Sequence, residues 1–129
     1  MTSVPTVAAS TLTDQIRAGV RRWPDTPVAF LGTRENPVLT LAQIHQQARR
    51  VAAGLRTLGL EPGDRVAMQL PNWPEAIVAY IAAVELRIAI IPVVHIYREA
   101  ELHFILGQSG ARALIIPDVW RNTDYVERV

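Results

Sequence analysis

Residues 58–97, LGLEPGDRVAMQLPNWPEAIVAYIAAVELRIAIIPVVHIY, contain the signals of a turn, a strand, a helix and a second strand in that order. Residues 61–64 (EPGD) predict the turn, because proline fixes one backbone position and glycine permits the next. Residues 65–70 have the composition of a strand, and residues 73–86 predict an almost entirely apolar helix that packs on most of its sides. Residues 88–94 are a continuous apolar run, which is typical of a parallel strand covered on both faces.

The polar residues at the two ends of this helix decide how the apolar stretch is interpreted. Asn72 is expected to cap the helix, Pro74 lies in the first turn, where its missing donor does no harm, and Glu75 lies near the positive end of the helix dipole. In the centre of a membrane span, Glu85 and Arg87 would each cost roughly 2.5 to 3.5 kcal/mol. The sequence therefore predicts a buried helix and a buried strand rather than a transmembrane segment.

The flanking residues continue the alternation of helices and strands. Thr40 and Gln43 form a capping box at the start of one helix, and Gly59 is suited to end that helix in a left-handed conformation. This alternation predicts an α/β fold with a mainly parallel sheet and helices on both faces, in one domain over residues 1–129. The other expected elements are a helix over 11–22, a hairpin of strands 28–31 and 38–40, a helix over 99–108, a strand over 113–116 and a last helix over 119–129.

The composition excludes several kinds of chemistry. All 13 basic residues are arginines, and the chain contains no cysteine. Without lysine there is no Schiff-base nucleophile or phosphate-binding ammonium, and without cysteine there are no disulfides, thiolate nucleophiles or cysteine-based metal sites. The net charge of +1 gives no reason to expect a nucleic-acid partner. The N-terminus lacks the basic and apolar segments of a secretory signal, so a cytoplasmic location is expected.

Several short motifs are informative when they are taken in order. They are GDRVA at 63–67, Pro71 and Asn72, Pro74 and Glu75, Pro92 and Val93, Tyr97, Glu101 and Leu102, and SGA at 109–111. Over residues 12–129 this series resembles the early part of the adenylate-forming (AMP-binding) enzymes, the superfamily of acyl-CoA synthetases, firefly luciferase and peptide-synthetase adenylation domains. The PVVHIY segment at 92–97 is more similar to acyl- or cyclohexanecarboxylate-CoA ligases than to peptide-synthetase domains.

The resemblance implies a reaction in two halves. A carboxylate attacks the α-phosphate of ATP to give an acyl-adenylate and pyrophosphate, and a thiol, usually that of coenzyme A, then displaces AMP. The resemblance also implies ATP, Mg²⁺ and CoA as cofactors of the full-length enzyme, and a fatty or alicyclic carboxylic acid as its substrate.

The family's own tools for this chemistry are missing from the sequence. They are a Ser/Thr/Gly-rich phosphate loop ending in P-K-G, a threonine and glutamate motif near magnesium, an aspartate on the ribose and a mobile lysine. We therefore expect an N-terminal fragment of an ATP-dependent acyl-CoA ligase that is catalytically incomplete by itself. No catalytic, cofactor-binding or metal-binding residue is assigned, and no cofactor is expected for this chain alone.

Two interpretations from other classes remain open. The chain is alternatively a free-standing scaffold or interaction module that forms homodimers through an unpaired strand edge and an uncovered apolar face. A generic nucleotide-binding domain is disfavoured, because no G-x-G-x-x-G follows a predicted strand. Arg17, Arg21 and Arg22 offer a basic patch for peripheral contact with an anionic membrane, but such a group is usually a solvated helix face.

Several single residues are candidates for functional roles. His95 follows a predicted strand and either contributes to a site or fixes its own loop. Trp73 either anchors the core or lines the substrate channel. His45 and His103 have no partners at metal-ligand spacing, so neither is expected to bind a metal.

Two further positions invite a structural explanation. Asp64 and Arg65 look like a reactive pair, but they are expected to tie the EPGD turn to neighbouring backbone. Arg87 lies where the family has a glycine that ends the helix. A left-handed backbone at a residue other than glycine costs about 1 kcal/mol, so this helix end is expected to be strained or built differently.

Overall fold

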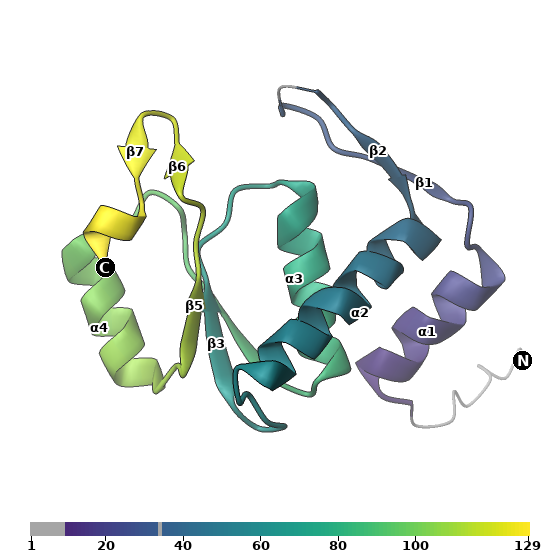
Figure 1. Cartoon of the computed structure of the whole chain (residues 1–129), viewed down its shortest axis with the longest axis horizontal. Coiled ribbons are helices and arrows are strands. Elements are labelled where there is room, and N and C mark those ends of the chain that lie inside the picture. The colour runs from purple at the N-terminus through teal and green to yellow at the C-terminus, as the bar shows by residue number, and fades with distance from the viewer. Residues whose placement is uncertain (1–9, 34) are drawn as a thin grey trace, which may run out of the picture.

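The computed structural model describes residues 10–33 and 35–129. Within these residues no helix has the length and apolar character needed to cross a membrane. The elements, coloured along the chain in Figure 1, are α1 (Leu12–Arg22), β1 (Pro27–Ala29), β2 (Val38–Thr40), α2 (Leu41–Thr57), β3 (Arg65–Met68), α3 (Pro74–Glu85), β4 (Ala89–Pro92), α4 (Glu99–Ser109), β5 (Ala113–Ile115), β6 (Val119–Trp120), β7 (Thr123–Asp124) and the 3-10 helix η1 (Val126–Arg128).

A three-stranded parallel sheet in the order β4-β3-β5 lies at the centre of the fold. The chain moves from β3 to β4 through α3, and then returns past β3 to β5 through α4. Right-handed connections that run in opposite directions place their helices on opposite faces of a sheet. Figure 1 shows this arrangement, with α3 and α2 on one face and α4 on the other. The predicted α/β fold, with a parallel sheet and helices on both faces, is confirmed.

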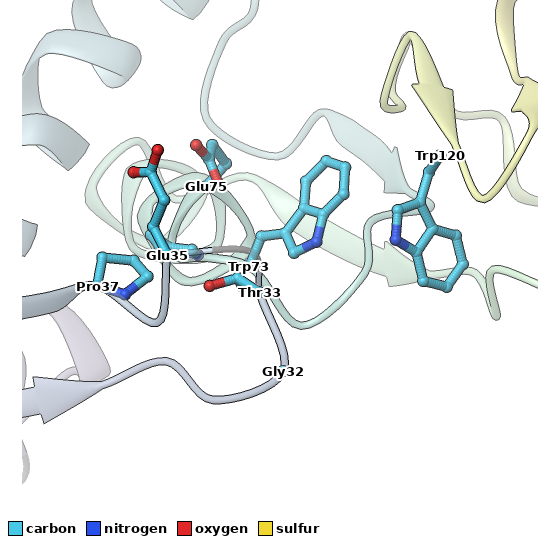
Figure 2. A pocket seen from close by; sticks show the side chains of 8 residues that line it. Gly32, Thr33, Glu35, Pro37, Trp73, Glu75 and Trp120 are labelled. Carbon is cyan, nitrogen blue, oxygen red and sulfur yellow. The ribbon is translucent and has the colours of Figure 1, made fainter.

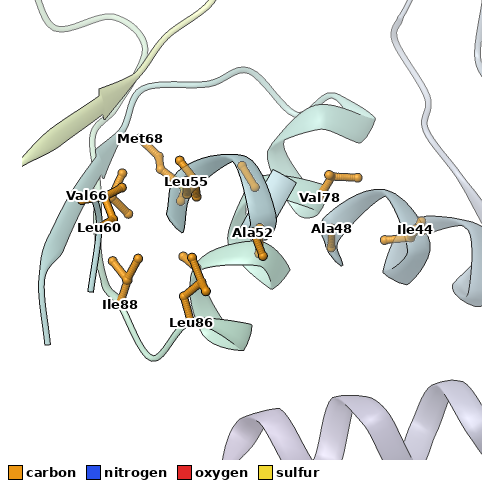
Figure 3. Packing of buried hydrophobic residues seen from close by; sticks show 13 residues of the cluster. Ile44, Ala48, Ala52, Leu55, Leu60, Val66, Met68, Val78, Leu86 and Ile88 are labelled. Carbon is orange, nitrogen blue, oxygen red and sulfur yellow. The ribbon is translucent and has the colours of Figure 1, made fainter. Parts of the chain in front are cut away.

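Alternate side chains of β3 connect the sheet to its two helical layers. Val66 and Met68 belong to the main core with α2 and α3, whereas Ala67 packs in a second cluster with Leu102 of α4. This alternation follows from the two-residue period of a strand. Figure 3 shows the main core, in which Ala48 of α2 is fully buried. Small residues such as Ala48 allow α2 and α3 to approach each other closely.

The last element predicted from the sequence is wrong. Residues 119–129 form the short hairpin β6–β7 and the helix η1 instead of one helix. Arg121 and Asn122, which join the two strands, both have positive φ, at 49° and 58°. That conformation defines the type I′ turn of a tight hairpin, because its twist matches the twist of the paired strands. The tight turn, rather than helical periodicity, therefore determines the local structure.

The start of α3 also differs from the prediction. Trp73, not Asn72, is the N-cap residue, and its side chain makes no capping hydrogen bond. Pro74 takes the first helical position, where proline is favoured. Trp73 has extended backbone geometry because it directly precedes this proline. The predicted capping box of Thr40 and Gln43 is confirmed, with a distance of 3.2 Å from Gln43 N to Thr40 Oγ1.

Arg87 adopts the left-handed conformation that the family's glycine would adopt, with φ of 58°. We expect Arg87→Gly to raise the free energy of unfolding by about 0.5 to 1 kcal/mol, because relief of the left-handed strain exceeds the entropic cost of glycine. Urea unfolding measures the change. Arg56→Gly, in the last turn of α2, is the matched control and should destabilise by about 1 kcal/mol. Equal destabilisation by both variants would show that Arg87 is unstrained.

Candidate functional site

The loops that follow the three parallel strands gather aromatic side chains at one edge of the sheet. Trp73 follows β3, His95 follows β4 and Trp120 follows β5. The ring centroids of Trp73 and Trp120 are 6.3 Å apart with an interplanar angle of 84°. His95 lies 4.8 Å from Trp120 at 89°. Ligands of open α/β sheets bind outside the carboxyl ends of the strands, so this edge is the candidate functional site.

Two adjoining depressions open beside these rings, and together we call them the aromatic hollow. Both are lined by Gly32, Thr33, Trp73 and Trp120. One part, of about 370 Å³, is completed by Leu31, Pro71, Asn72, His95 and Arg121. The other part, of about 410 Å³, is completed by Glu35, Pro37, Pro74 and Glu75. Figure 2 shows the side chains of Glu35 and Glu75 on the far side of Trp73 from Trp120.

The charges in the aromatic hollow are unevenly distributed. Glu35 and Glu75 line one part, and Arg121 lines the other. The guanidinium carbon of Arg121 lies 4.6 Å from the centroid of the Trp120 ring, a cation–π contact. The hollow therefore has an acidic end and a basic end, with Trp73 and Trp120 between them.

The loop that carries His95 is held by three hydrogen bonds from two side chains. Gln69 is 1% exposed, and its Nε2 donates to the carbonyl oxygens of Val94 and Tyr97, each at 3.0 Å. The Tyr125 hydroxyl donates to the His95 carbonyl oxygen at 3.1 Å. Because these bonds fix the backbone on both sides of His95, they also fix where its ring meets Trp120.

Asp64 and Arg65 lie at the opposite edge of the sheet, where β3 begins. The Asp64 carboxylate accepts from the backbone N–H of Glu61 at 2.7 Å and from Arg112 Nη1 at 2.9 Å. Arg65 Nη1 donates to the carbonyl oxygen of Ser109 at 3.1 Å. The prediction that both residues tie the turn to neighbouring backbone is confirmed.

His45 belongs to a polar cluster that sequence analysis did not find. Its Nε2 lies 2.9 Å from Glu85 Oε1, and Arg17 Nε donates to Glu85 Oε2 at 3.1 Å. The pKa of the Glu85 carboxyl is lowered, mainly by its hydrogen bond with Arg17. The Arg17 side chain is half exposed, as expected of a solvated helix face, but its guanidinium also joins α1 to α3. His103 is exposed on α4, and the described residues contain no group of three or more His, Asp or Glu side chains that could hold a metal ion.

Sequence reasoning missed three residues of the candidate site. Gln69 carried a signal, since a lone amide at the end of an apolar strand needs buried hydrogen-bond partners. Trp120 and Arg121 were assigned to a helix. The Arg-Asn dipeptide between Val-Trp and Thr-Asp is compatible with a two-residue hairpin loop, and that interpretation would have placed both at the edge of the sheet.

Comparison with known proteins assigns the chain to a family. The model for the AMP-binding enzyme family matches residues 16–129, and the chain belongs to this family. It is 41% identical over 119 residues to the salicyl-AMP ligase / salicyl-S-ArCP synthetase of Mycobacterium tuberculosis, which covers 89% of this chain and 21% of that protein. It is 31% identical over 90 residues to the medium-chain fatty-acid–CoA ligase of Escherichia coli, which covers 70% of this chain and 16% of that protein.

Solved structures agree with this assignment. The N-terminal subdomain of Klebsiella oxytoca NpsA, in complex with 3-hydroxybenzoyl-AMSN, matches with a TM-score of 0.82 and 24% identity. The match covers 100% of this chain and 30% of that chain, and at this identity it shows the fold alone. The Mycobacterium tuberculosis fatty acyl CoA synthetase matches with a TM-score of 0.73 and 28% identity. The match covers 81% of this chain and 20% of that chain. The chain thus spans about a fifth of the length of the curated relatives that it matches.

Proposed function

We propose that this chain is the N-terminal part of an ATP-dependent ligase that joins a carboxylic acid to a thiol through an acyl-adenylate. It forms one α/β unit within the larger AMP-binding domain. The observation that carries the proposal is the family match over residues 16–129, since the fold alone would not define a reaction. The names of the relatives from Mycobacterium tuberculosis and Escherichia coli both describe ligases of carboxylic acids.

In the proposed reaction, a carboxylate oxygen attacks the α-phosphate of ATP and pyrophosphate leaves. A thiol then displaces AMP and takes the acyl group. Positive charge that is already in place stabilises such phosphate oxygens as negative charge develops on them. ATP, Mg²⁺ and a thiol such as that of CoA are therefore proposed for the whole enzyme.

The residues of this chain do not fit ATP and Mg²⁺. The described glycines with positive φ are Gly32, Gly59, Gly63 and Gly110, which lie in separate turns and not in one phosphate-binding loop. The chain has no lysine, and its described acidic side chains form no cluster that could hold a metal. We therefore propose that the chain alone is inactive. Its role in the ligase is to form part of the sheet and the helical layers that support the rest of the domain.

The substrate class that we propose is an aromatic carboxylic acid. The sequence motif at 92–97 favoured a fatty or alicyclic acid, but identity to the salicyl-AMP ligase is 41%, against 31% for the fatty-acid ligase. The name salicyl-S-ArCP synthetase also suggests a carrier-protein thiol as an acceptor in place of CoA.

The genomic sequence beyond the codon for Val129 and the activity of the whole encoded protein test this proposal. We expect an open frame that continues into a Ser/Thr/Gly-rich loop ending in P-K-G. The whole protein should exchange pyrophosphate into ATP faster with salicylate than with cyclohexanecarboxylate or octanoate. Preference for octanoate would overturn the aromatic class. An immediate stop codon with a stable dimeric product would instead support the scaffold module.

A further inference from the structure

We propose that Gln69 is a positioning residue of the ligase. Its buried side chain holds the turn of residues 94–97, and through this turn it fixes His95 at the carboxyl edge of the sheet. Ligands of open α/β sheets bind at that edge, so the position of His95 should affect how the carboxylic acid is bound. This role rests on the ligase function proposed above, and it belongs to a residue that is buried beneath the edge.

Gln69 joins the carboxyl ends of all three parallel strands. It directly follows β3, and its backbone N–H donates to the carbonyl oxygen of Ile115 in β5 at 2.9 Å. Its side chain extends to the loop after β4, where Nε2 donates to the carbonyl oxygens of Val94 and Tyr97. Within the described residues, Gln69 is the one polar side chain that is buried. Burial of an amide is unfavourable unless its hydrogen bonds are made, so these two bonds account for a glutamine at this position.

The turn of residues 94–97 depends on polar contacts. Its side chains lie largely outside the core, since Val94 is 48% exposed and Ile96 is 68% exposed. One hydrogen bond closes the turn, from the Tyr97 backbone N–H to the Val94 carbonyl oxygen at 3.1 Å. The Gln69 amide binds the carbonyl oxygens at both ends of the turn. Because few apolar contacts hold this turn, loss of the amide should let it open locally.

His95 is the residue of the turn that lines the aromatic hollow. Its ring lies 4.8 Å from that of Trp120, at an interplanar angle of 89°. Its backbone is restrained a second time, because the hydroxyl of the buried Tyr125 donates to the His95 carbonyl oxygen at 3.1 Å. A displacement of about 1 Å in a group that positions a substrate can reduce the rate about a hundredfold. Restraint of His95 by Gln69 is therefore expected to matter for the reaction.

The test compares variants of the whole encoded protein in pyrophosphate exchange into ATP. The acid is salicylate, or cyclohexanecarboxylate or octanoate if the protein prefers one of them. Gln69→Met nearly keeps the volume of the side chain and removes both donors. We expect KM for the acid to rise about five- to tenfold, with kcat and KM for ATP nearly unchanged, because the nucleotide site is proposed to lie in other parts of the enzyme. Gln108→Met, at an exposed glutamine of α4, is the matched control and should have no effect.

A double variant tests whether Gln69 acts through His95. His95→Ala alone should raise KM for the acid by a similar factor. Addition of Gln69→Met to His95→Ala should change KM little further, because the residue that Gln69 positions is already missing. If the two factors multiply instead, Gln69 does not act through His95. If Gln69→Met lowers kcat and leaves both KM values unchanged, it only reduces the folded fraction, and the proposal is overturned.

Tyr125→Phe covers the case in which Gln69→Met does not fold. This variant removes the hydroxyl that restrains the turn and keeps the buried ring. We expect KM for the acid to rise about two- to threefold, since one hydrogen bond to the turn is lost while both bonds from Gln69 remain. An unchanged KM would then overturn the proposal.

An inactive wild-type protein would separate this proposal from the proposed function. If the whole protein exchanges no pyrophosphate with any of the three acids, the ligase function fails, and the positioning is measured by NMR in the 129-residue chain. The nuclear Overhauser effect between the ring protons of His95 and Trp120 should be lost in Gln69→Met and kept in Gln108→Met. Its persistence in Gln69→Met would show that Gln69 does not position His95.

Discussion

Replacement of Ala48 with leucine is expected to lower the free energy of unfolding by about 2 to 3 kcal/mol. Ala48 lies on α2 against α3 and is fully buried in the main core. Three added carbons have no space there, so either the leucine leaves its preferred rotamers or the helices separate and expose the core. The midpoint and slope of urea unfolding measure the loss.

Ala53→Leu is the matched control for this variant. Ala53 lies on the same helix and is exposed, so the same substitution should change stability by no more than about 0.5 kcal/mol. If Ala48→Leu were tolerated as well as Ala53→Leu, the close approach of α2 and α3 would be refuted.

Glu85→Gln is expected to lower the free energy of unfolding by about 1 to 2 kcal/mol at pH 7, because Arg17 and His45 lose their charged acceptor. The Glu85 side chain is 8% exposed, and these partners come from two other helices. α1 depends on this cluster, since none of its own residues is fully buried. Thr13 Oγ1, which donates to the Val84 carbonyl oxygen at 3.0 Å, is a further polar contact between α1 and α3.

The effect of Glu85 on stability should depend on pH in a defined direction. The Arg17 hydrogen bond holds the pKa of Glu85 below its ordinary value of 4.5 in the folded state. The resulting stabilisation is present above pH 4.5 and is lost as the pH falls through the lower, folded-state value. The wild-type protein and Glu85→Gln should therefore converge in stability as the pH falls below 4.5. Glu61→Gln, at an exposed glutamate, should show no such convergence, and a constant difference for Glu85→Gln would contradict this explanation.

The sequence predicted the elements that local rules specify. The capping box of Thr40 and Gln43, the glycine that ends α2 and the order of strands and helices all depend on neighbouring residues, and the structure confirms them. The end of α3 also follows a local rule. The helix must end at Arg87 whichever residue is present there, so the arginine adopts the left-handed conformation.

The features that the sequence did not predict depend on contacts between distant residues or on competition between local rules. Arg17 and His45 meet Glu85 across 68 and 40 residues, and no local pattern joins them. The hairpin β6–β7 is different, because its apolar residues fit a helical face as well as two short strands. The type I′ turn at Arg121 and Asn122 decides between them, and it also moves Trp120 to the candidate site.

The most direct test of the central claim is calorimetric titration of the purified chain with ATP and Mg²⁺. The chain is proposed to form part of the ligase fold, with the nucleotide site formed by other parts of the enzyme. We therefore predict no binding in the micromolar range, and no pyrophosphate exchange with any carboxylic acid. Clear saturable binding of ATP at micromolar concentration would contradict this assignment of the nucleotide site.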